Sequence, residues 1–296
     1  LVLWWRPSRL SMFRGSAARM GSSATTSYAN TPMQQPFDAA VVVTTVCRPS
    51  LVRAVGSVFR QVGVSRLQVL IGIDAAEADA AVMSALLAER PPQHAVTVLD
   101  LGYSTSVRHG GLHAAIDGGA MRTILTYCAN SRFVTYLDDD NWLHESHVAA
   151  LLAAIRDRDW AYTLRYFVEP ESLEVAAVDR WESVGPGKGV FAEKMGGFVD
   201  PNCLMIDKLK CDDMIRFWTT PLPGGERLFT DRSVFETLRR RPVGFTGAAT
   251  VYYLMGTNDA DKVTRMSLLR EIRRRHGTAP LMSLAPLSAW SVENVA

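Results

Sequence analysis

Three consecutive carboxylates, Asp138, Asp139 and Asp140, are the side chains of this sequence best suited to chemistry. Three neighbouring negative charges in a partly buried crevice would repel one another unless a cation lay between them. Carboxylate oxygens suit Mg²⁺ or Mn²⁺ better than zinc, and Mg²⁺ typically combines one or two carboxylates with substrate phosphates. An acidic run is equally typical of a solvated loop or a helix N-terminus, so the triplet alone leaves both interpretations open.

The residues before the triplet predict the element that positions it. Residues 133–137 are mostly β-branched or aromatic and are largely apolar on both faces, which is typical of a central strand in a sheet covered by helices on each side. Open α/β sheets bind ligands outside the carboxyl ends of their strands. The three aspartates are therefore expected at a ligand-binding edge.

A regular alternation of strands and helices surrounds this strand. Strands are expected at 39–46, 68–73, 96–99 and 161–167, and helices at 50–62 and 75–89. This alternation predicts an α/β fold with a mostly parallel central sheet and right-handed crossovers.

The second half of the chain gives weaker patterns. Residues 169–199 contain acidic side chains and a glycine cluster, so we expect a long, mobile functional segment there. A helix is expected to begin at Thr230 or Asp231, with strands at 243–246 and 249–255. A basic amphipathic helix at 262–275 is more typical of a solvated face than of a nucleic-acid-binding arm.

Composition excludes several classes of protein. The 296 residues are 48% hydrophobic and 21% charged with a net charge of +2, as in a globular protein whose main partner is neither nucleic acid nor a membrane surface. The four cysteines lie far apart with no C-x-x-C pair, so we expect buried free thiols in a reducing compartment. No apolar run is long enough for a transmembrane segment.

The first 36 residues differ from the rest. They are rich in Arg and Ser and contain no acidic residue, which is typical of an organellar transit peptide or of a non-native extension. We expect them to be disordered and the fold to start near Phe37. The expected organisation is then a domain at 37–257, divided into a nucleotide-binding half (37–140) and an acceptor-binding half (141–257), followed by a C-terminal helix and tail (258–296).

Several features in order along the chain resemble a glycosyltransferase of the GT-A fold, most similar to glycosyltransferase family 2. The resemblance runs from about Val41 to Tyr253. It rests on the strand that ends in Thr44 and Thr45, on Arg48 after it, on Asp74 after the second strand, on Arg108 in the glycine-containing loop 102–111, and on the aspartate triplet.

The resemblance implies roles for these residues. The nucleotide-sugar-binding residues would be Thr44, Thr45, Arg48, Asp74, Arg108, Asp138 and Asp139. Asp138 and Asp140 would hold Mn²⁺ or Mg²⁺, with Asp140 the direct ligand. The general base that the family carries at the start of a later helix corresponds by position to Asp231, although the usual Glu-Asp pair is absent, and an ordinary helix cap is the other interpretation.

The implied activity is metal-dependent, inverting transfer of a sugar from a nucleoside diphosphate sugar, with a UDP-sugar expected, to a hydroxyl of a glycan, lipid-linked or small-molecule acceptor. Such an enzyme is expected in the cytoplasm, either free or peripheral to the membrane. Two alternatives stay open: a non-catalytic nucleotide- or sugar-binding module on the same fold, and a sugar nucleotidyltransferase. The latter normally carries a glycine-rich loop after the first strand, where residues 44–49 contain no glycine.

Overall fold

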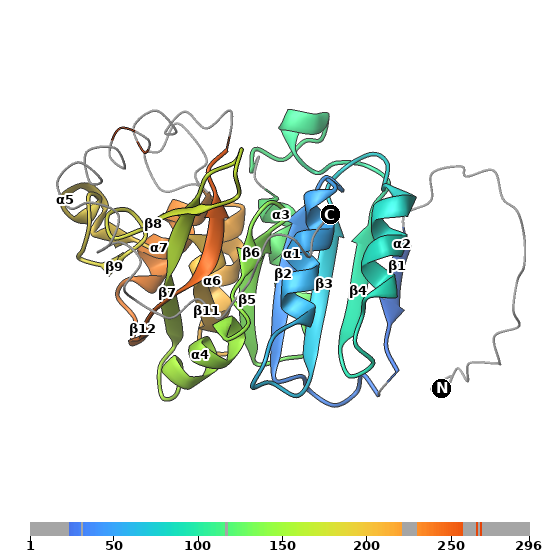
Figure 1. Ribbon diagram of the computed structural model, residues 1–296, viewed down its shortest axis with the longest axis horizontal. Helices are drawn as coiled ribbons and strands as arrows, with labels where there is room; N and C mark the ends of the chain where they lie inside the picture. The colour runs from blue at the N-terminus through green and yellow to red at the C-terminus, as the bar shows by residue number, and fades with distance from the viewer. Residues whose placement is uncertain are drawn as a thin grey trace, which may run out of the picture.

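The computed structural model describes residues 24–30, 32–115, 118–220, 230–256, 265 and 267. Its centre is a ten-stranded sheet flanked by helices, with α1 and α2 in front of the sheet and α3 behind it (Figure 1). This architecture confirms the expected α/β fold of the GT-A type.

Nine strands follow one another across the sheet in the order β1-β4-β3-β2-β5-β11-β7-β12-β6, and β8 pairs with β7. Their bounds are β1 Ala24–Tyr28, β2 Ala39–Thr45, β3 Leu67–Ile73, β4 Ala95–Asp100, β5 Phe133–Asp138, β6 Trp142–Leu143, β7 Trp160–Val168, β8 Val175–Val178, β11 Leu204–Asp207 and β12 Val243–Leu254. Strands β4, β3, β2 and β5 run parallel to one another, as do β7 and β12, whereas β11 between them pairs antiparallel with both β5 and β7. The two short strands β9 (Gly185–Pro186) and β10 (Gly197–Phe198) form a separate pair.

The helices are short, and α1, α3 and α4 pack on the sheet through apolar side chains. Their bounds are α1 Ser50–Phe59, α2 Ala80–Ala88, α3 Gly119–Cys128, α4 His147–Ala154, α5 Ala192–Met195, α6 Asp212–Ile215 and α7 Thr230–Leu238. Strands β2 and β3 are buried along almost their whole length, which explains their continuous apolar sequences. Leu51, Val55 and Val58 of α1 are fully buried against them.

The structure corrects the expected start of the fold. Ala24–Tyr28 form β1, which lies antiparallel to β4 at the edge of the sheet. The ordered fold therefore begins at least 13 residues before Phe37, within the segment expected to be disordered. The sequence Ala-Thr-Thr-Ser-Tyr is exposed and polar, so it lacks the apolar pattern of a core strand.

Two later expectations are also wrong. Residues 169–199 contain β8, β9, α5 and β10 instead of one long loop. The strands expected at 243–246 and 249–255 are one strand, β12, with irregularities in its pairing to β7 around Phe245 and Ala249. The expected helix at 262–275 lies outside the described residues, apart from two helical positions, 265 and 267. No helix in the described part of the chain is long and apolar enough to cross a membrane.

Candidate active site

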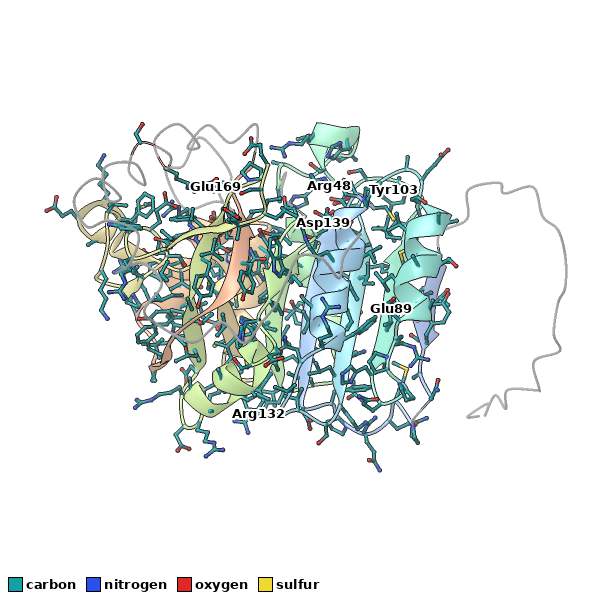
Figure 2. All side chains as sticks on the ribbon, viewed as in Figure 1. Arg48, Glu89, Tyr103, Arg132, Asp139 and Glu169 are labelled. Atoms are coloured by element: carbon teal, nitrogen blue, oxygen red, sulfur yellow. The ribbon has the colours of Figure 1, made fainter. Side chains whose placement is uncertain are left out.

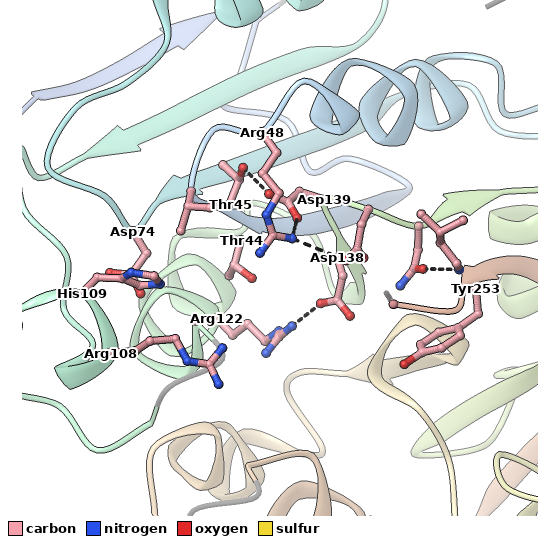
Figure 3. Close-up of a pocket in the computed structure, with 16 residues that line it drawn as sticks. Thr44, Thr45, Arg48, Asp74, Arg108, His109, Arg122, Asp138, Asp139 and Tyr253 are labelled. Atoms are coloured by element: carbon pink, nitrogen blue, oxygen red, sulfur yellow. Dashed lines mark hydrogen bonds and ion pairs between the residues drawn. The ribbon is translucent and has the colours of Figure 1, made fainter. Parts of the chain in front are cut away.

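A pocket of about 640 Å³ opens where β2, β3 and β5 end (Figure 3). Its lining residues include eight of the nine that the sequence nominates: Thr44, Thr45, Arg48, Asp74, Arg108, Asp138, Asp139 and Asp140. Arg48 and Asp139 lie together at this end of the sheet, whereas Arg132, just before β5, lies at the opposite end (Figure 2). The parallel order of β3, β2 and β5 brings the ends of these strands to one edge.

Asp139 fastens the loop after β2 to the end of β5. Its Oδ2 accepts a hydrogen bond from Thr45 Oγ1 at 2.6 Å, and its Oδ1 accepts one from Arg48 Nη1 at 3.0 Å. Burial raises the pKa of Asp139 above its ordinary value, although Thr45 and Arg48 stabilise the charged form. Both of its oxygens are therefore engaged within the protein.

The backbone between Thr45 and Arg48 makes a sharp turn at Cys47. This residue has a left-handed conformation with φ of 67°, which is costly for a side chain other than glycine. Its N–H donates to Thr45 Oγ1 at 2.7 Å. The same hydroxyl thus accepts from the turn and donates to Asp139, and it sets the direction from which Arg48 enters the pocket.

Asp138 is held on two sides. Arg122 of α3 forms an ion pair with its Oδ1, and Asn202 Nδ2 donates to its Oδ2 at 2.8 Å. The backbone N–H of Asp138 also donates to Asn202 Oδ1 at 2.6 Å. Since both partners are buried and the Asp138 side chain is one-third exposed, this carboxylate faces the pocket in a fixed orientation.

Asp140 is the most accessible of the three carboxylates, with 41% of its side chain exposed. Within the described part of the chain its carboxylate has one cationic contact, Arg48 Nη1 at 3.4 Å. Burial, followed by repulsion from Asp138 and Asp139, raises the pKa of Asp140 to about 7. A carboxylate so poorly compensated is suited to a divalent cation.

The pocket offers a divalent cation a single well-placed carboxylate and not a complete set of protein ligands. No group of three or more His, Cys, Asp or Glu side chains in the described residues is arranged to hold a metal. Mg²⁺ does not need one, because it usually takes one or two carboxylates with phosphate oxygens and water. Asp140 fits this role directly, whereas Asp138 already accepts from Arg122 and Asn202.

Asp74 forms the far wall of the pocket from the end of β3. Its Oδ1 accepts from Ser104 Oγ at 3.1 Å and from the N–H of Thr105 at 2.5 Å, which ties it to the segment after β4. Its Oδ2 accepts no hydrogen bond from the described residues. A carboxylate at a pocket wall is suited to accept from a ribose hydroxyl or a base N–H donor.

Positive side chains line the pocket between these carboxylates. They are Arg48, Arg108, Arg122 and, when protonated, His109. Arg108 and His109 belong to a short 3-10 turn, Val107–His109, and Arg122 lies in the first turn of α3. Arg108 and Arg122 both line the pocket (Figure 3), and their guanidinium groups would attract phosphate oxygens.

Sequence reasoning missed Arg122, Asn202 and Tyr253. Arg122 is 5% exposed and is the one charged residue of α3, and a lone charge in such a helix was the feature that could have identified it. Asn202 follows a proline in a polar turn, and nothing in the sequence around it indicated a role in the site. Tyr253 and Leu254 belong to β12 and close the pocket opposite Asp74, which only the folded sheet can reveal.

Asp231 is not among the residues that line the pocket. It lies in the first turn of α7, and its Oδ1 accepts from the N–H of Arg232 at 2.7 Å. Residues 221–229, directly before α7, lie outside the described residues. Its role as general base stays a prediction.

Comparisons with known proteins identify the fold. No protein-family model and no curated protein matches the sequence. Among solved structures, a Staphylococcus aureus TarS fragment, residues 1–349, is similar, with a TM-score of 0.52 and 14% identity over 80% of this chain and 65% of that chain. A second S. aureus TarS structure gives a TM-score of 0.51 with 12% identity and is covered to 40%. This chain therefore spans less than two thirds of the TarS chains that it resembles, and the likeness is one of fold. The TarS fragment has also been solved with UDP and with UDP-GlcNAc, at a TM-score of 0.49 in each case.

Proposed function

We propose that this chain is a glycosyltransferase that takes a sugar from a nucleoside diphosphate sugar, with a UDP-sugar the first donor to test, and passes it to a hydroxyl acceptor. The observation that carries the proposal is the convergence of Asp74, Asp138, Asp140 and three arginines on one pocket at the carboxyl edge of the sheet. TarS, which shares the fold, has been solved with UDP-GlcNAc, and this guides the choice of donor.

The pocket residues divide into two groups along a bound donor. Asp74 would accept hydrogen bonds from the ribose or base, beside Thr44 and Thr45 at the end of β2. Arg108 and Arg122 would contact the diphosphate, whose charge increases as the anomeric C–O bond breaks. Because arginine carries a planar set of donors, it matches phosphate oxygens better than a point charge does.

We further propose that Asp140 holds Mg²⁺ or Mn²⁺ together with the diphosphate. The bound cation would neutralise charge on the leaving group. Asp140 is suited to this by its exposure and by its raised pKa, and cation binding would keep it ionised at neutral pH. Asp138 would orient the donor while it remains paired with Arg122.

Inversion at the anomeric carbon requires a base on the face opposite the leaving group. We propose Asp231 for this step, from its place at the start of α7. Asp231→Asn should then abolish transfer and leave donor binding within about twofold, since the base acts on the acceptor and contributes little to ground-state binding of the donor.

A thermal-shift series tests the donor site. UDP, GDP, dTDP and CDP are added with and without Mn²⁺, because a ligand that binds only the folded state raises its stability by about 2.7 kcal/mol at a hundred times its Kd. We expect stabilisation by UDP that depends on Mn²⁺ and is lost in Asp140→Asn. The matched control is Asp212→Asn, an exposed aspartate at the start of α6 that does not line the pocket.

A second assay separates transfer from binding. We expect the chain to release UDP slowly from a UDP-sugar with Mn²⁺ present. Nucleotide binding without release from any common donor would favour the binding module. Absence of binding by every nucleotide would refute the proposal.

A further inference from the structure

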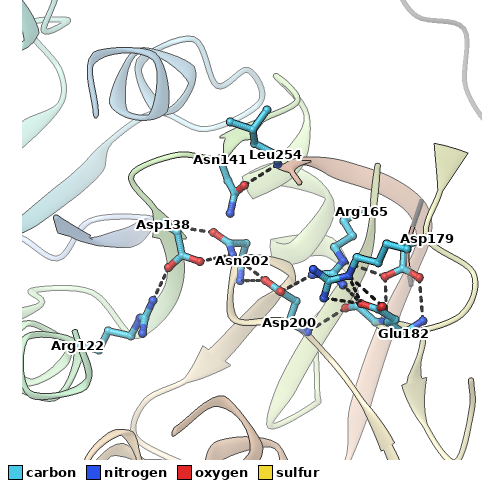
Figure 4. A network of polar contacts seen from close by, with 11 residues as sticks. Arg122, Asp138, Asn141, Arg165, Asp179, Glu182, Asp200, Asn202 and Leu254 are labelled. Atoms are coloured by element: carbon cyan, nitrogen blue, oxygen red, sulfur yellow. Dashed lines mark hydrogen bonds and ion pairs between the residues drawn. The ribbon is translucent and has the colours of Figure 1, made fainter. Parts of the chain in front are cut away.

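A second cluster of charges surrounds Arg165 of β7 (Figure 4). The side chain is 1% exposed, and its guanidinium pairs with three carboxylates: Nε with Asp179 at 2.8 Å, Nη2 with Glu182 at 2.8 Å, and Nη1 with Asp200. Asp179 and Glu182 come from the segment 169–199, which the sequence predicted to be long and mobile, and Asp200 follows directly after it. A buried arginine with three buried or nearly buried carboxylates is costly unless its charges are balanced.

A second arginine balances this cluster from the C-terminal part of the chain. Arg265 Nε donates to Glu182 Oε1 at 3.0 Å, and its Nη2 donates to Glu182 Oε2 at 2.9 Å. Its side chain is only 10% exposed. The cluster therefore holds two guanidinium groups against three carboxylates, and it would hold one against three without Arg265.

Hydrogen bonds connect this cluster to the pocket. Asp200 Oδ1 accepts from Asn202 Nδ2 at 2.7 Å, and the same amide group donates to Asp138 Oδ2 at 2.8 Å. Asn202 is fully buried, so water does not compete for these bonds. The Asp138 carboxylate thus belongs to a chain of polar contacts that ends at Arg265, as Figure 4 shows for its inner members.

A second connection runs through Tyr253, which lines the pocket. Its ring lies 4.1 Å from the guanidinium carbon of Arg165 and 5.5 Å from that of Arg265. Cation–π contacts of this kind are strongest where water is excluded. The two arginines therefore support one wall of the pocket as well as one of its carboxylates.

We propose that the cluster of Arg165, Asp179, Glu182 and Asp200 is a positioning device for the pocket, and that Arg265 completes it as a positioning residue. It holds Asn202 so that Asp138 faces the pocket, and it holds the ring of Tyr253 as the opposite wall. The consequence for donor binding rests on the proposed function. The consequence for the Asp138 hydrogen bond does not.

Loss of Arg265 should act on Asp138 through charge. Glu182 would then share only Arg165, which also serves Asp179 and Asp200, so three carboxylates would compete for one guanidinium. A less well compensated Asp200 would hold Asn202 less firmly. The bond from the Asp138 N–H to Asn202 Oδ1 would then open more often.

The experiment replaces Arg265, because Arg165 is too deeply buried for an informative substitution. Arg265→Met removes the charge and keeps an apolar stem of similar length, and Arg265→Lys restores the charge without the planar fork. The control is Arg241→Met, which breaks a two-bond ion pair with Asp213 elsewhere on the surface. Asn202→Ala serves as the positive control because it removes the acceptor itself.

The direct readout is residue-resolved hydrogen exchange of the Asp138 amide, compared with amides of β3. Loss of one hydrogen bond corresponds to at most about tenfold faster exchange in Asn202→Ala. We expect several-fold acceleration in Arg265→Met, partial rescue in Arg265→Lys, and wild-type exchange in Arg241→Met. The amides of β3 should change in none of these variants beyond what their global stability predicts.

The second readout is the Kd for UDP with Mn²⁺, which should rise several-fold in Arg265→Met and less in Arg265→Lys. Wild-type exchange at Asp138 in Arg265→Met would overturn the proposal, whatever happens to nucleotide binding. If the wild-type protein bound no nucleotide while exchange followed the expected order, the positioning device would stand and the proposed function would fail.

Discussion

His147 makes the stability of this fold depend on pH. The side chain, at the start of α4, is fully buried, and its Nδ1 lies 2.8 Å from Thr250 Oγ1. That hydroxyl donates to Thr163 Oγ1 at 2.9 Å, so it accepts from the imidazole, and the proton of neutral His147 is on Nδ1. Its Nε2 is buried with no hydrogen-bond partner among the described residues. Burial, with a smaller contribution from His144, lowers the pKa of His147 from 6.5 to about 3.

The size of the pH effect follows from the difference between the pKa of His147 in the folded chain and its pKa in the unfolded chain. Below pH 6.5 the unfolded chain binds a proton at this residue and the folded chain does not, so acid favours unfolding. The stability from neutral His147 is fully present above pH 6.5 and is lost as the pH falls from 6.5 towards 3. At pH 5, which is 1.5 units below 6.5, the loss is about 2 kcal/mol, since one pKa unit corresponds to about 1.4 kcal/mol.

Urea unfolding at pH 7 and pH 5 measures this effect. His147→Gln cannot be protonated, so its loss of stability between the two pH values should be about 2 kcal/mol smaller than that of the wild type. The control is His109→Gln, which makes the same replacement at an exposed histidine. Groups that titrate in all three proteins, including buried His94, cancel in the comparison. Equal losses in His147→Gln and the wild type would refute the reasoning.

Three further predictions concern the site and its support. Arg122→Met should weaken UDP binding by about tenfold or more, because one charge-assisted contact to phosphate is worth about 1.5–3 kcal/mol, and isothermal titration would show a smaller loss in Arg122→Lys. Gly72→Ala should destabilise the protein by about 1–3 kcal/mol in urea unfolding, because the new Cβ would lie 2.8 Å from Leu125 Cδ1 and 3.0 Å from Met121 Cβ of α3; Gly56→Ala, which meets the flexible end of Arg60 within a helix, should be neutral or stabilising by under about 1 kcal/mol. EDTA should abolish UDP release by the wild type, and Mn²⁺ should restore it there but not in Asp140→Asn; release that persists in EDTA would contradict the metal proposal.

The parallel half of the sheet was predictable from local sequence. β2, β3 and β5 are buried on both faces, so their apolar runs are continuous and end in polar residues at the pocket edge. The expected ends of these strands agree with the structure within about one residue. For the same reason the sequence alone places the triplet, Asp74 and the residues after β2 at one edge of the sheet.

The remaining parts of the site depend on contacts that local patterns do not encode. Arg122 and Asn202 reach Asp138 across sequence separations of 16 and 64 residues. Arg165 lies within an apolar strand, and its three carboxylate partners follow in a segment that resembles a surface loop. β1 is exposed on both faces and is held by backbone pairing to β4, so hydrophobic patterning could not reveal it.

The position of Tyr253 and Leu254 bears on how the protein forms during synthesis. The first wall of the pocket is encoded by residues 44–140, and the opposite wall is supplied by the end of β12. Because chains fold from the N-terminus as they leave the ribosome, the strands that carry the aspartates emerge well before the residues that enclose them. A ligand could then bind in an enclosed pocket only after β12 has joined the sheet. A nascent chain that stalls before β12 would carry the aspartate triplet without an enclosed cavity.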